Sequence, residues 1–240
     1  MIDTHAHLGD DADAVLERAK AAGVTRVIDV ATSVAAARAV LERAASRDGV
    51  YACLGIHPHE AAGEDDPDDL RELLAHPKAV AVGETGLDYY RDYAPREAQR
   101  RVFDTQLALA LETRKPVVIH TRSADDETRT RLLAHDGPVV LHCFSSPPLL
   151  DAALERGWYV SFAGNVTYKN AYSLRDCARQ VPIERLLAET DSPYLAPQAV
   201  RGRRNEPAYV AHTYAFLSEL RGEDVRERIE ENTVRVFGLT

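Results

Sequence analysis

Two short apolar runs of the sequence each end in a histidine, Val117-Val118-Ile119-His120 and Val139-Val140-Leu141-His142. Between them lies Thr128–His135, in which apolar residues recur at helical spacing. Short apolar runs predict buried strands, here Val117–Ile119 and Val139–Leu141, and a helix between two strands favours parallel pairing through a right-handed crossover. This part of the chain therefore predicts a strand–helix–strand unit whose strands end in polar side chains.

The same unit recurs along the rest of the chain. Six more strands are expected, at Met1–Thr4, Arg26–Val30, Tyr51–Gly55, Ala79–Val82, Tyr159–Phe162 and Leu186–Ala188. Further helices are expected at Ala12–Ala22, Ala35–Ser46, Asp68–Ala75, Arg96–Thr113, Pro148–Arg156, Ala171–Arg179 and Pro207–Leu220. Eight strands alternating with helices in 240 residues predict one α/β domain, 1–240, folded as a (β/α)8 TIM barrel, which typically takes roughly 250 residues. Neither a GxGxxG fingerprint nor a Walker-type loop is present, which argues against a nucleotide cofactor.

The composition is that of a soluble globular protein, with 45% hydrophobic and 28% charged residues. No apolar run approaches the roughly 20 residues that cross a membrane. The N-terminus lacks the basic and apolar regions of a signal peptide. The three cysteines of the chain are scattered along the sequence, which fits a reducing compartment. We therefore expect a cytoplasmic protein with no membrane contact.

The formal net charge of −9 gives no sign of a nucleic-acid partner, because the overall field repels a polyanion. Any nucleic acid must be held locally, by bound metal ions and a few arginines. The acidic surface also favours a monomer.

Polar side chains stand where five of the expected strands end. They are His5 and His7 after the first strand, then Glu84, His120, His142 and Asp191. In a barrel, the carboxyl ends of the strands meet at one mouth, where active sites are built. One such residue alone is more often a hydrogen-bonding group, but six together, with a His-x-His pair on one strand face, favour a metal site.

Nitrogen and oxygen ligands without a thiolate suit zinc, magnesium or manganese. Six ligands exceed the three or four expected for one catalytic ion. Two divalent metal ions that share a bridging carboxylate are therefore expected, and their identity stays open.

The chain resembles the TatD family of metal-dependent deoxyribonucleases, within the amidohydrolase superfamily. The matching segments lie in order from one end of the chain to the other. They are Ile2-Asp3-Thr4-His5-Ala6-His7-Leu8, Gly55-Ile56-His57-Pro58-His59, Gly83-Glu84-Thr85-Gly86-Leu87-Asp88-Tyr89-Tyr90, Val118-Ile119-His120-Thr121-Arg122, Leu141-His142-Cys143-Phe144-Ser145, Ser161 to Asn170, Glu189-Thr190-Asp191-Ser192-Pro193-Tyr194-Leu195 and Arg201-Gly202-Arg203-Arg204-Asn205-Glu206-Pro207.

The resemblance implies an amidohydrolase-like barrel and metal ligands at the same six positions, His5, His7, Glu84, His120, His142 and Asp191. It also implies that Glu84 bridges two ions. Related amidohydrolases use a carboxylated lysine for that bridge, so a glutamate fits the TatD branch.

As a mechanism we hypothesise that one ion is held by His5, His7, Glu84 and Asp191, and the other by Glu84, His120 and His142. Coordination lowers the pKa of water toward about 7. The catalytic residues would be Glu84 and Asp191, with Asp191 orienting the water and accepting its proton. The hydroxide would then attack phosphorus in line.

Substrate contacts are expected from His57, Arg122, Arg201, Arg203 and Arg204. An arginine can grip a phosphate through two parallel hydrogen bonds. Structural roles are the alternative to these substrate contacts. His57 could pack against its own loop, and the arginines could lie in solvent or pair with acidic side chains. Tyr168, Lys169 and Tyr194 are further candidates at the mouth, where an aromatic ring could stack on a base.

Three functions remain open. The favoured one is a deoxyribonuclease of the 3′-5′ exonuclease type that acts on DNA, single-stranded or at 3′ ends. The same two-metal site could attack a carbonyl, as in a D-aminoacyl-tRNA deacylase or another ester or amide hydrolase. A binding protein that keeps the barrel without catalysis is disfavoured by the intact set of ligands.

Overall fold

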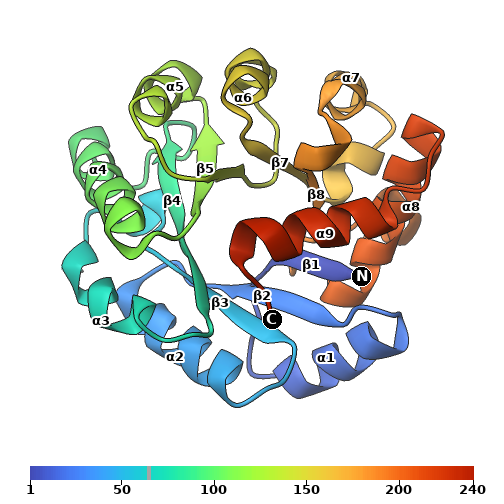
Figure 1. Cartoon of the computed structure of the whole chain (residues 1–240), viewed down its shortest axis with the longest axis horizontal. Helices are drawn as coiled ribbons and strands as arrows, with labels where there is room; N and C mark the ends of the chain where they lie inside the picture. The colour runs from blue at the N-terminus through green and yellow to red at the C-terminus, as the bar shows by residue number, and fades with distance from the viewer. Residues whose placement is uncertain (64–65) are drawn as a thin grey trace.

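The structure, a computed structural model, describes residues 1–63 and 66–240. Eight parallel strands form one sheet in the order of the sequence (Figure 1). They are β1 Ile2–Ala6, β2 Arg26–Val30, β3 Val50–Leu54, β4 Ala79–Asp88, β5 Val117–Arg122, β6 Val139–Leu141, β7 Tyr159–Phe162 and β8 Leu186–Ala188. The expected TIM barrel is confirmed, whereas the extent of the domain, 1–240, stays a prediction.

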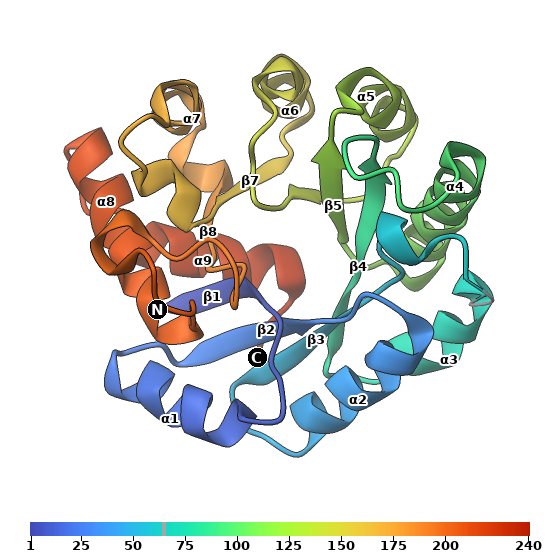
Figure 2. The same ribbon diagram turned by 180° about the vertical axis from the view of Figure 1, so that it is seen from behind.

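Helices alternate with the strands and form the outer layer of the barrel (Figure 2). They are α1 Ala12–Ala21, α2 Val34–Ala45, α3 Leu70–Leu74, α4 Arg96–Thr113, α5 Asp125–Leu133, α6 Leu150–Arg156, α7 Tyr172–Gln180 and α8 Val210–Arg221. A further helix, α9 Arg226–Phe237, follows α8 with no strand between them. Each of the eight expected helical stretches overlaps one of the first eight. None of the helices in the described ranges has the length and apolar character to cross a bilayer.

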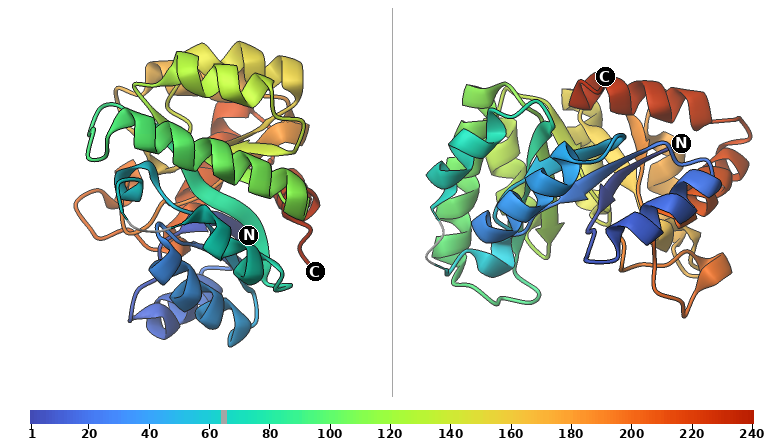
Figure 3. Two further views of the ribbon diagram at one scale, coloured as in Figure 1. Left: turned by 90° about the vertical axis from the view of Figure 1, so that its left-hand side faces the viewer. Right: turned by 90° about the horizontal axis from the view of Figure 1, so that it is seen from below.

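Helix α9 was not expected from the sequence. Its residues Ile229, Val236 and Phe237 are buried, and Val236 and Phe237 join the apolar cluster inside the barrel. Figure 3 shows α9 at the same end as both termini, opposite the long loops that follow the strands. The helix thus covers the amino-terminal end of the barrel and leaves the other end for the site.

Two layers of apolar side chains surround the strands. One fills the space between strands and helices, and the other lies inside the barrel, where Ile28, Val118 and Leu187 are almost fully buried. Strands buried on both faces explain why the sequence showed continuous apolar runs rather than alternation.

Strands β4 and β5 run further than predicted. The apolar run of β4 ends at Val82, yet the strand continues through Glu84 to Asp88. Its extension pairs with that of β5, where Gly86 lies opposite His120. A Cβ on Gly86 would overlap the carbonyl oxygen of His120, so only glycine permits this approach. The extended ends of β4 and β5 can therefore carry polar residues such as Glu84 and His120, whose side chains face each other rather than the apolar core.

The barrel is nearly closed between β8 and β1. The backbone N–H of Asp191 donates to the carbonyl of His5 (2.9 Å), and the N–H of His7 donates to Ser192 (2.8 Å). Asp3 reaches across the same seam, accepting hydrogen bonds from the backbone N–H (2.8 Å) and hydroxyl (2.6 Å) of Thr190. The seam therefore brings the residues after β8 next to the first strand.

Candidate metal centre

Glu84 lies at the centre of the mouth, and five histidines surround its carboxylate. The distances from a ring nitrogen to the nearer carboxylate oxygen are 3.4 Å for His5, 3.9 Å for His7, 3.4 Å for His57, 2.8 Å for His120 and 2.9 Å for His142. These residues come from β1, β3, β5 and β6 or from the residues directly after them. The structure therefore brings together side chains that lie far apart in the sequence, from His5 to His142.

The alternation of side chains along a strand explains this convergence. Every second residue of a strand faces the same side, so a polar residue two positions after an interior apolar residue lies above it at the mouth. Such pairs are Val118 and His120, Val140 and His142, and Leu187 and Glu189.

A close approach of two glycines sets His57 beside Glu84. A Cβ on Gly55 would lie 2.5 Å from the carbonyl carbon of Gly83, so β3 and β4 can come this close only without a side chain at Gly55. His57 and Glu84 each follow one of these glycines by one or two residues.

The Oε1 oxygen of Glu84 faces one group of histidines. It lies 2.8 Å from Nδ1 of His120, 2.9 Å from Nε2 of His142 and 3.4 Å from Nε2 of His57. The two shorter distances are those of charge-assisted hydrogen bonds. His120 and His142 thus hold this side of Glu84 by direct contacts.

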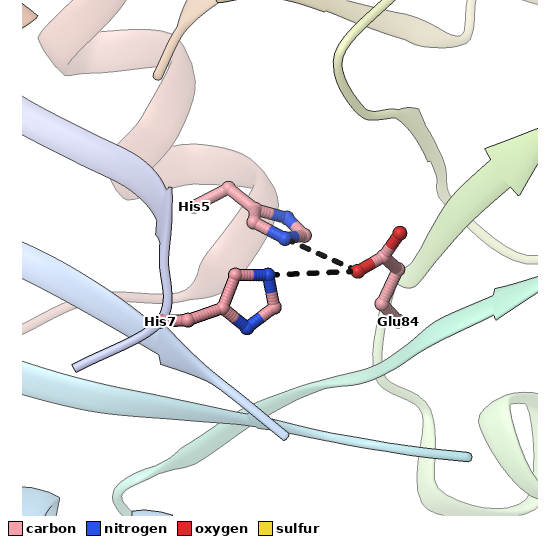
Figure 4. Close-up of side chains that lie close together, drawn as sticks. All are labelled: His5, His7 and Glu84. Carbon is pink, nitrogen blue, oxygen red and sulfur yellow. Dashed lines mark ion pairs between the residues drawn. The ribbon is translucent and has the colours of Figure 1, made fainter. Parts of the chain in front are cut away.

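The Oε2 oxygen faces a second group, whose nitrogens lie further from it (Figure 4). It lies 3.4 Å from Nε2 of His5 and 3.9 Å from Nε2 of His7. The Oδ1 oxygen of Asp191 lies 3.9 Å and 3.7 Å from the same two nitrogens. These distances are too long for hydrogen bonds, whereas two atoms that bind one zinc at about 2.1 Å in a tetrahedral array lie about 3.4 Å apart.

The partners behind the rings show which nitrogens can bind an ion. His7 directs Nδ1 at the carbonyl of Val30 (3.0 Å), and His142 directs Nδ1 at Glu189 (3.0 Å). His120 directs Nε2 at Asp88 (3.3 Å). Each of these oxygens accepts a hydrogen bond from the rear nitrogen, which fixes the ring and leaves the front nitrogen as the donor to an ion.

His57 differs from these three. Its Nδ1 accepts a hydrogen bond from the backbone N–H of His59 (3.1 Å). In the neutral ring the proton then resides on Nε2, which faces Glu84. His57, Glu84 and His120 are close enough to form a metal-binding group. The hydrogen bond nevertheless favours His57 as a donor to an oxygen, in line with the substrate contact expected from the sequence.

His5 provides the observation that best tests the fit of a metal. The residue is fully buried, and neither ring nitrogen has a hydrogen-bond partner in the described part of the chain. A buried polar atom without a partner costs about 1–3 kcal/mol. An ion at Nε2 would remove part of this cost, and the imidazole and carboxylate donors around it suit a divalent cation.

The charges of the cluster are strongly coupled. Burial acts to raise the pKa of Glu84, but the charges of His142 and His57 and the hydrogen bonds from His120 outweigh it, and the pKa lies well below its usual range. Burial lowers the pKa of His5, and it lowers the pKa of His57 to about 4. Glu84 is thus an anion surrounded by imidazoles, and an ion that binds here displaces protons from some of them.

Three histidines of the cluster have raised pKa values, and that of His142 lies well above its usual range. Burial acts to lower the pKa of each, but the neighbouring carboxylates outweigh it. They are Asp191 and Glu84 for His7, Asp88 and Glu84 for His120, and Glu84 and Glu189 for His142.

Two carboxylates that contact the histidines from behind, Glu189 and Asp88, were not expected from the sequence as part of the site. Glu189 is fully buried, and its Oε1 accepts hydrogen bonds from His142 and from the backbone of Cys143 (2.8 Å). Asp88 contacts both His120 and His59, the latter at 2.8 Å. Glu189 stands two residues after the interior Leu187, so alternation along β8 was a signal for it. Asp88 had no such signal, because β4 continues past its apolar run.

The expected substrate-binding arginines lie in different surroundings. The guanidinium of Arg122 lies 3.9 Å from the ring centre of Tyr90, and that of Arg201 lies 3.9 Å from that of Tyr168. Arg203 is exposed and forms no ion pair with any described residue. Their assignment to substrate stays a prediction.

Arg204 contacts Asp11 at 2.8 Å and lines a cavity of about 160 Å³ that also contacts His7. Arg18 and Glu206 form a second ion pair in the same wall (2.6 Å). Arg204 is thus paired with an acidic side chain, which was one of the alternatives to a substrate contact. It lines the same cavity as His7.

Comparison with known proteins now identifies the family. The model of the family described as "TatD related DNase" matches residues 2–238. The chain belongs to the TatD family. It is 39% identical to a protein of Bacillus subtilis named an uncharacterized metal-dependent hydrolase, YabD, with 100% of this chain and 99% of that protein covered. It is 34% identical to a protein of Citrobacter rodentium named 3′-5′ ssDNA/RNA exonuclease TatD, over 96% of this chain and 93% of that protein.

A solved structure agrees with the sequence comparison. The TatD homologue YJJV of Escherichia coli superposes with a TM-score of 0.92 at 34% identity, covering 100% of this chain and 98% of that one. The expected family and fold are confirmed. This TatD protein is a metal-dependent hydrolase, and its cluster of histidines and carboxylates contains groups close enough to hold a metal ion.

Proposed function

We propose that this TatD protein is a deoxyribonuclease of the 3′-5′ exonuclease type that uses two divalent ions, zinc, magnesium or manganese. The single observation that carries the proposal is the position of Glu84, whose two oxygens face two separate groups of ligands. His5, His7, Glu84 and Asp191 would hold one ion, and Glu84, His120 and His142 the other. We also propose that the protein is a monomer, that it is cytoplasmic and that it consists of one domain.

When bound, the two ions would activate a water molecule and neutralise the charge that develops on a phosphate. The residues of the chain supply the rest. Asp191 lies beside His5 and His7 on the Oε2 side of the cluster, where its Oδ1 can orient the attacking water and accept its proton. His57 presents an N–H beside Glu84, a position from which it can donate to a phosphate oxygen.

Nucleic acid is favoured as the substrate by the arginines around the mouth and by the names of several relatives. Arg122, Arg201 and Arg203 are free of carboxylate partners among the described residues. They are thus available to a phosphate without first breaking an ion pair. Relatives from Citrobacter rodentium and Enterobacter lignolyticus are named 3′-5′ ssDNA/RNA exonucleases, which supports the same class of substrate for this chain.

The test is the cleavage of end-labelled single-stranded DNA by the wild type and by Asp191→Asn, with magnesium, manganese and zinc. We expect stepwise shortening from the 3′ end that a chelator abolishes. The substitution keeps the size of the side chain and removes the proton acceptor, so kcat should fall by about 10²–10⁴-fold. Near-wild-type activity of Asp191→Asn would remove Asp191 from the mechanism.

Intact DNA with every metal would contradict the nuclease. The same metal centre could then act on a carbonyl, and a D-aminoacyl-tRNA or a small ester or amide would be the next substrate to assay. The fold and the metal centre do not depend on that outcome.

A further inference from the structure

Exposed tyrosines stand beside the metal centre on the loop that follows β4. Tyr90 and Tyr93 are 62% and 64% exposed. The guanidinium of Arg122 lies 3.9 Å from the ring centre of Tyr90, and that of Arg91 lies 6.0 Å from each of the two rings. The ring of Tyr93 packs edge-on against His59, with 4.8 Å between centres. We call Tyr90, Tyr93 and Arg122 the β4 platform.

A second group lies on the other side of the mouth, on the loops that follow β7 and β8. Tyr194 is 62% exposed, and its ring centre lies 6.2 Å from that of His7. Tyr168 is half-buried beneath the guanidinium of Arg201, at 3.9 Å. We call Tyr194, Tyr168 and Arg201 the β8 platform.

The two platforms flank the proposed ions. The β8 platform contacts His7, which faces the Oε2 oxygen of Glu84. The β4 platform contacts His59, whose ring centre lies 6.2 Å from that of His120, a residue that faces Oε1. A phosphate held over Glu84 would therefore have one platform on each side.

The charge at these positions differs from that of the whole protein. The net charge is −9, yet Arg91, Arg122 and Arg201 form no ion pair within residues 1–63 and 66–240 and lie against aromatic rings instead. An exposed aromatic ring costs free energy in water, and every nucleobase offers a flat face that can cover it. Arginine adds attraction for the phosphate beside the base.

We propose that the β4 and β8 platforms stack the unpaired bases on the two sides of the phosphate to be cleaved, so that the substrate must be single-stranded there. The proposal rests on the proposed nuclease function and adds the residues that select the strand. A base paired in a duplex cannot offer its face to a tyrosine, because its neighbours in the stack already cover both faces.

The experiment is steady-state cleavage of a short oligothymidylate by the metal-loaded wild type, Tyr93→Ala and Tyr194→Ala, with Tyr93→Phe and Tyr194→Phe as matched controls. Stacking of one base on one ring corresponds to an affinity change of roughly 10-fold or more. We expect each alanine variant to raise KM by that factor with a smaller change in kcat. Each phenylalanine variant should retain the wild-type KM, because the ring remains.

An oligonucleotide that lacks bases separates stacking from other effects. Its KM should be the same for the wild type and the alanine variants, because there is no base for the ring to contact. The double variant, Tyr93→Ala with Tyr194→Ala, should also lose the preference for single-stranded over duplex DNA.

Each outcome has a distinct meaning. Cleavage of oligothymidylate by the wild type with unchanged KM in both alanine variants would overturn the platforms and leave the nuclease intact. An equal rise of KM on the abasic strand would also overturn them, since the loss would not involve bases. A wild type that neither binds nor cleaves the oligonucleotide would overturn the proposed function itself.

Discussion

The two oxygens of Glu84 have different surroundings. On the Oε1 side, His120 and His142 contact the carboxylate at 2.8 and 2.9 Å, and Asp88 and Glu189 hold these rings from behind. On the Oε2 side, His5 and His7 stay 3.4 and 3.9 Å away. One side is closed by hydrogen bonds, and the other has the spacing of a ligand set around an ion.

The difference follows from the architecture. The Oε1 side is built on β4, β5 and β6, which pair directly with one another. The Oε2 side lies at the seam between β8 and β1, which is closed by loop residues after β8 rather than by paired strands. An ion on the Oε1 side must displace the short contacts of His120 and His142 with Glu84, whereas His5 and His7 on the Oε2 side already lie 3.4 and 3.9 Å from the carboxylate.

The largest effect is expected from Glu84→Gln, because this residue serves both sides. The amide keeps the shape of the side chain and loses the charge that two ions would share. We expect both ions to bind more weakly and kcat to fall by at least about 10²-fold. Metal content by mass spectrometry and cleavage rates check this result. Loss of one ion alone would show that Glu84 does not bridge.

An intermediate effect is expected from variants that act on one side only. Glu189→Ala removes the acceptor behind His142 and should weaken only the Oε1-side ion, by roughly 10–100-fold. Glu189→Gln is the matched control, since its amide oxygen can still accept from the ring. His7→Ala should weaken only the Oε2-side ion.

Manganese titrations followed by electron paramagnetic resonance can count the two binding events separately. Equal weakening of both events by Glu189→Ala would contradict the independence of the two sides. So would the loss of the Oε1-side event in His7→Ala.

The smallest effect is expected from Tyr214→Phe, which removes a contact between α8 and β1 without touching the cluster. The hydroxyl of Tyr214 donates to the carbonyl of Ile2 (2.9 Å) and lies 3.3 Å from its backbone N–H. Its loss should lower the free energy of unfolding by about 1 kcal/mol and leave metal content unchanged. Chemical denaturation of the metal-loaded protein measures the first quantity. A large loss of metal would show that β1 depends on this contact to place His5 and His7.

Much of the barrel could be predicted because each strand is buried on both faces. Such strands appear as separate apolar runs, and the polar residues that follow several of these runs lie at the mouth. This rule placed Glu84, His120 and His142 around one point, as the distances now show. The His-x-His pair of β1 reached the same point because both side chains face Glu84.

Other features of the fold and the site depend on contacts between distant parts of the chain, which a local sequence pattern does not indicate. The extension of β4 to Asp88 has no apolar run, and it forms because Gly86 lets β4 and β5 approach closely. Helix α9 is mostly polar, and only its few buried residues close the barrel. The tautomer of His57 depends on the backbone of His59, a contact made by the turn that follows β3.

Anomalous X-ray scattering from crystals of the manganese-loaded protein shows whether Glu84 bridges two ions. We predict two peaks, one between His5, His7, Glu84 and Asp191, and one between Glu84, His120 and His142. A single peak, or two peaks that do not share Glu84, would rule out the bridge.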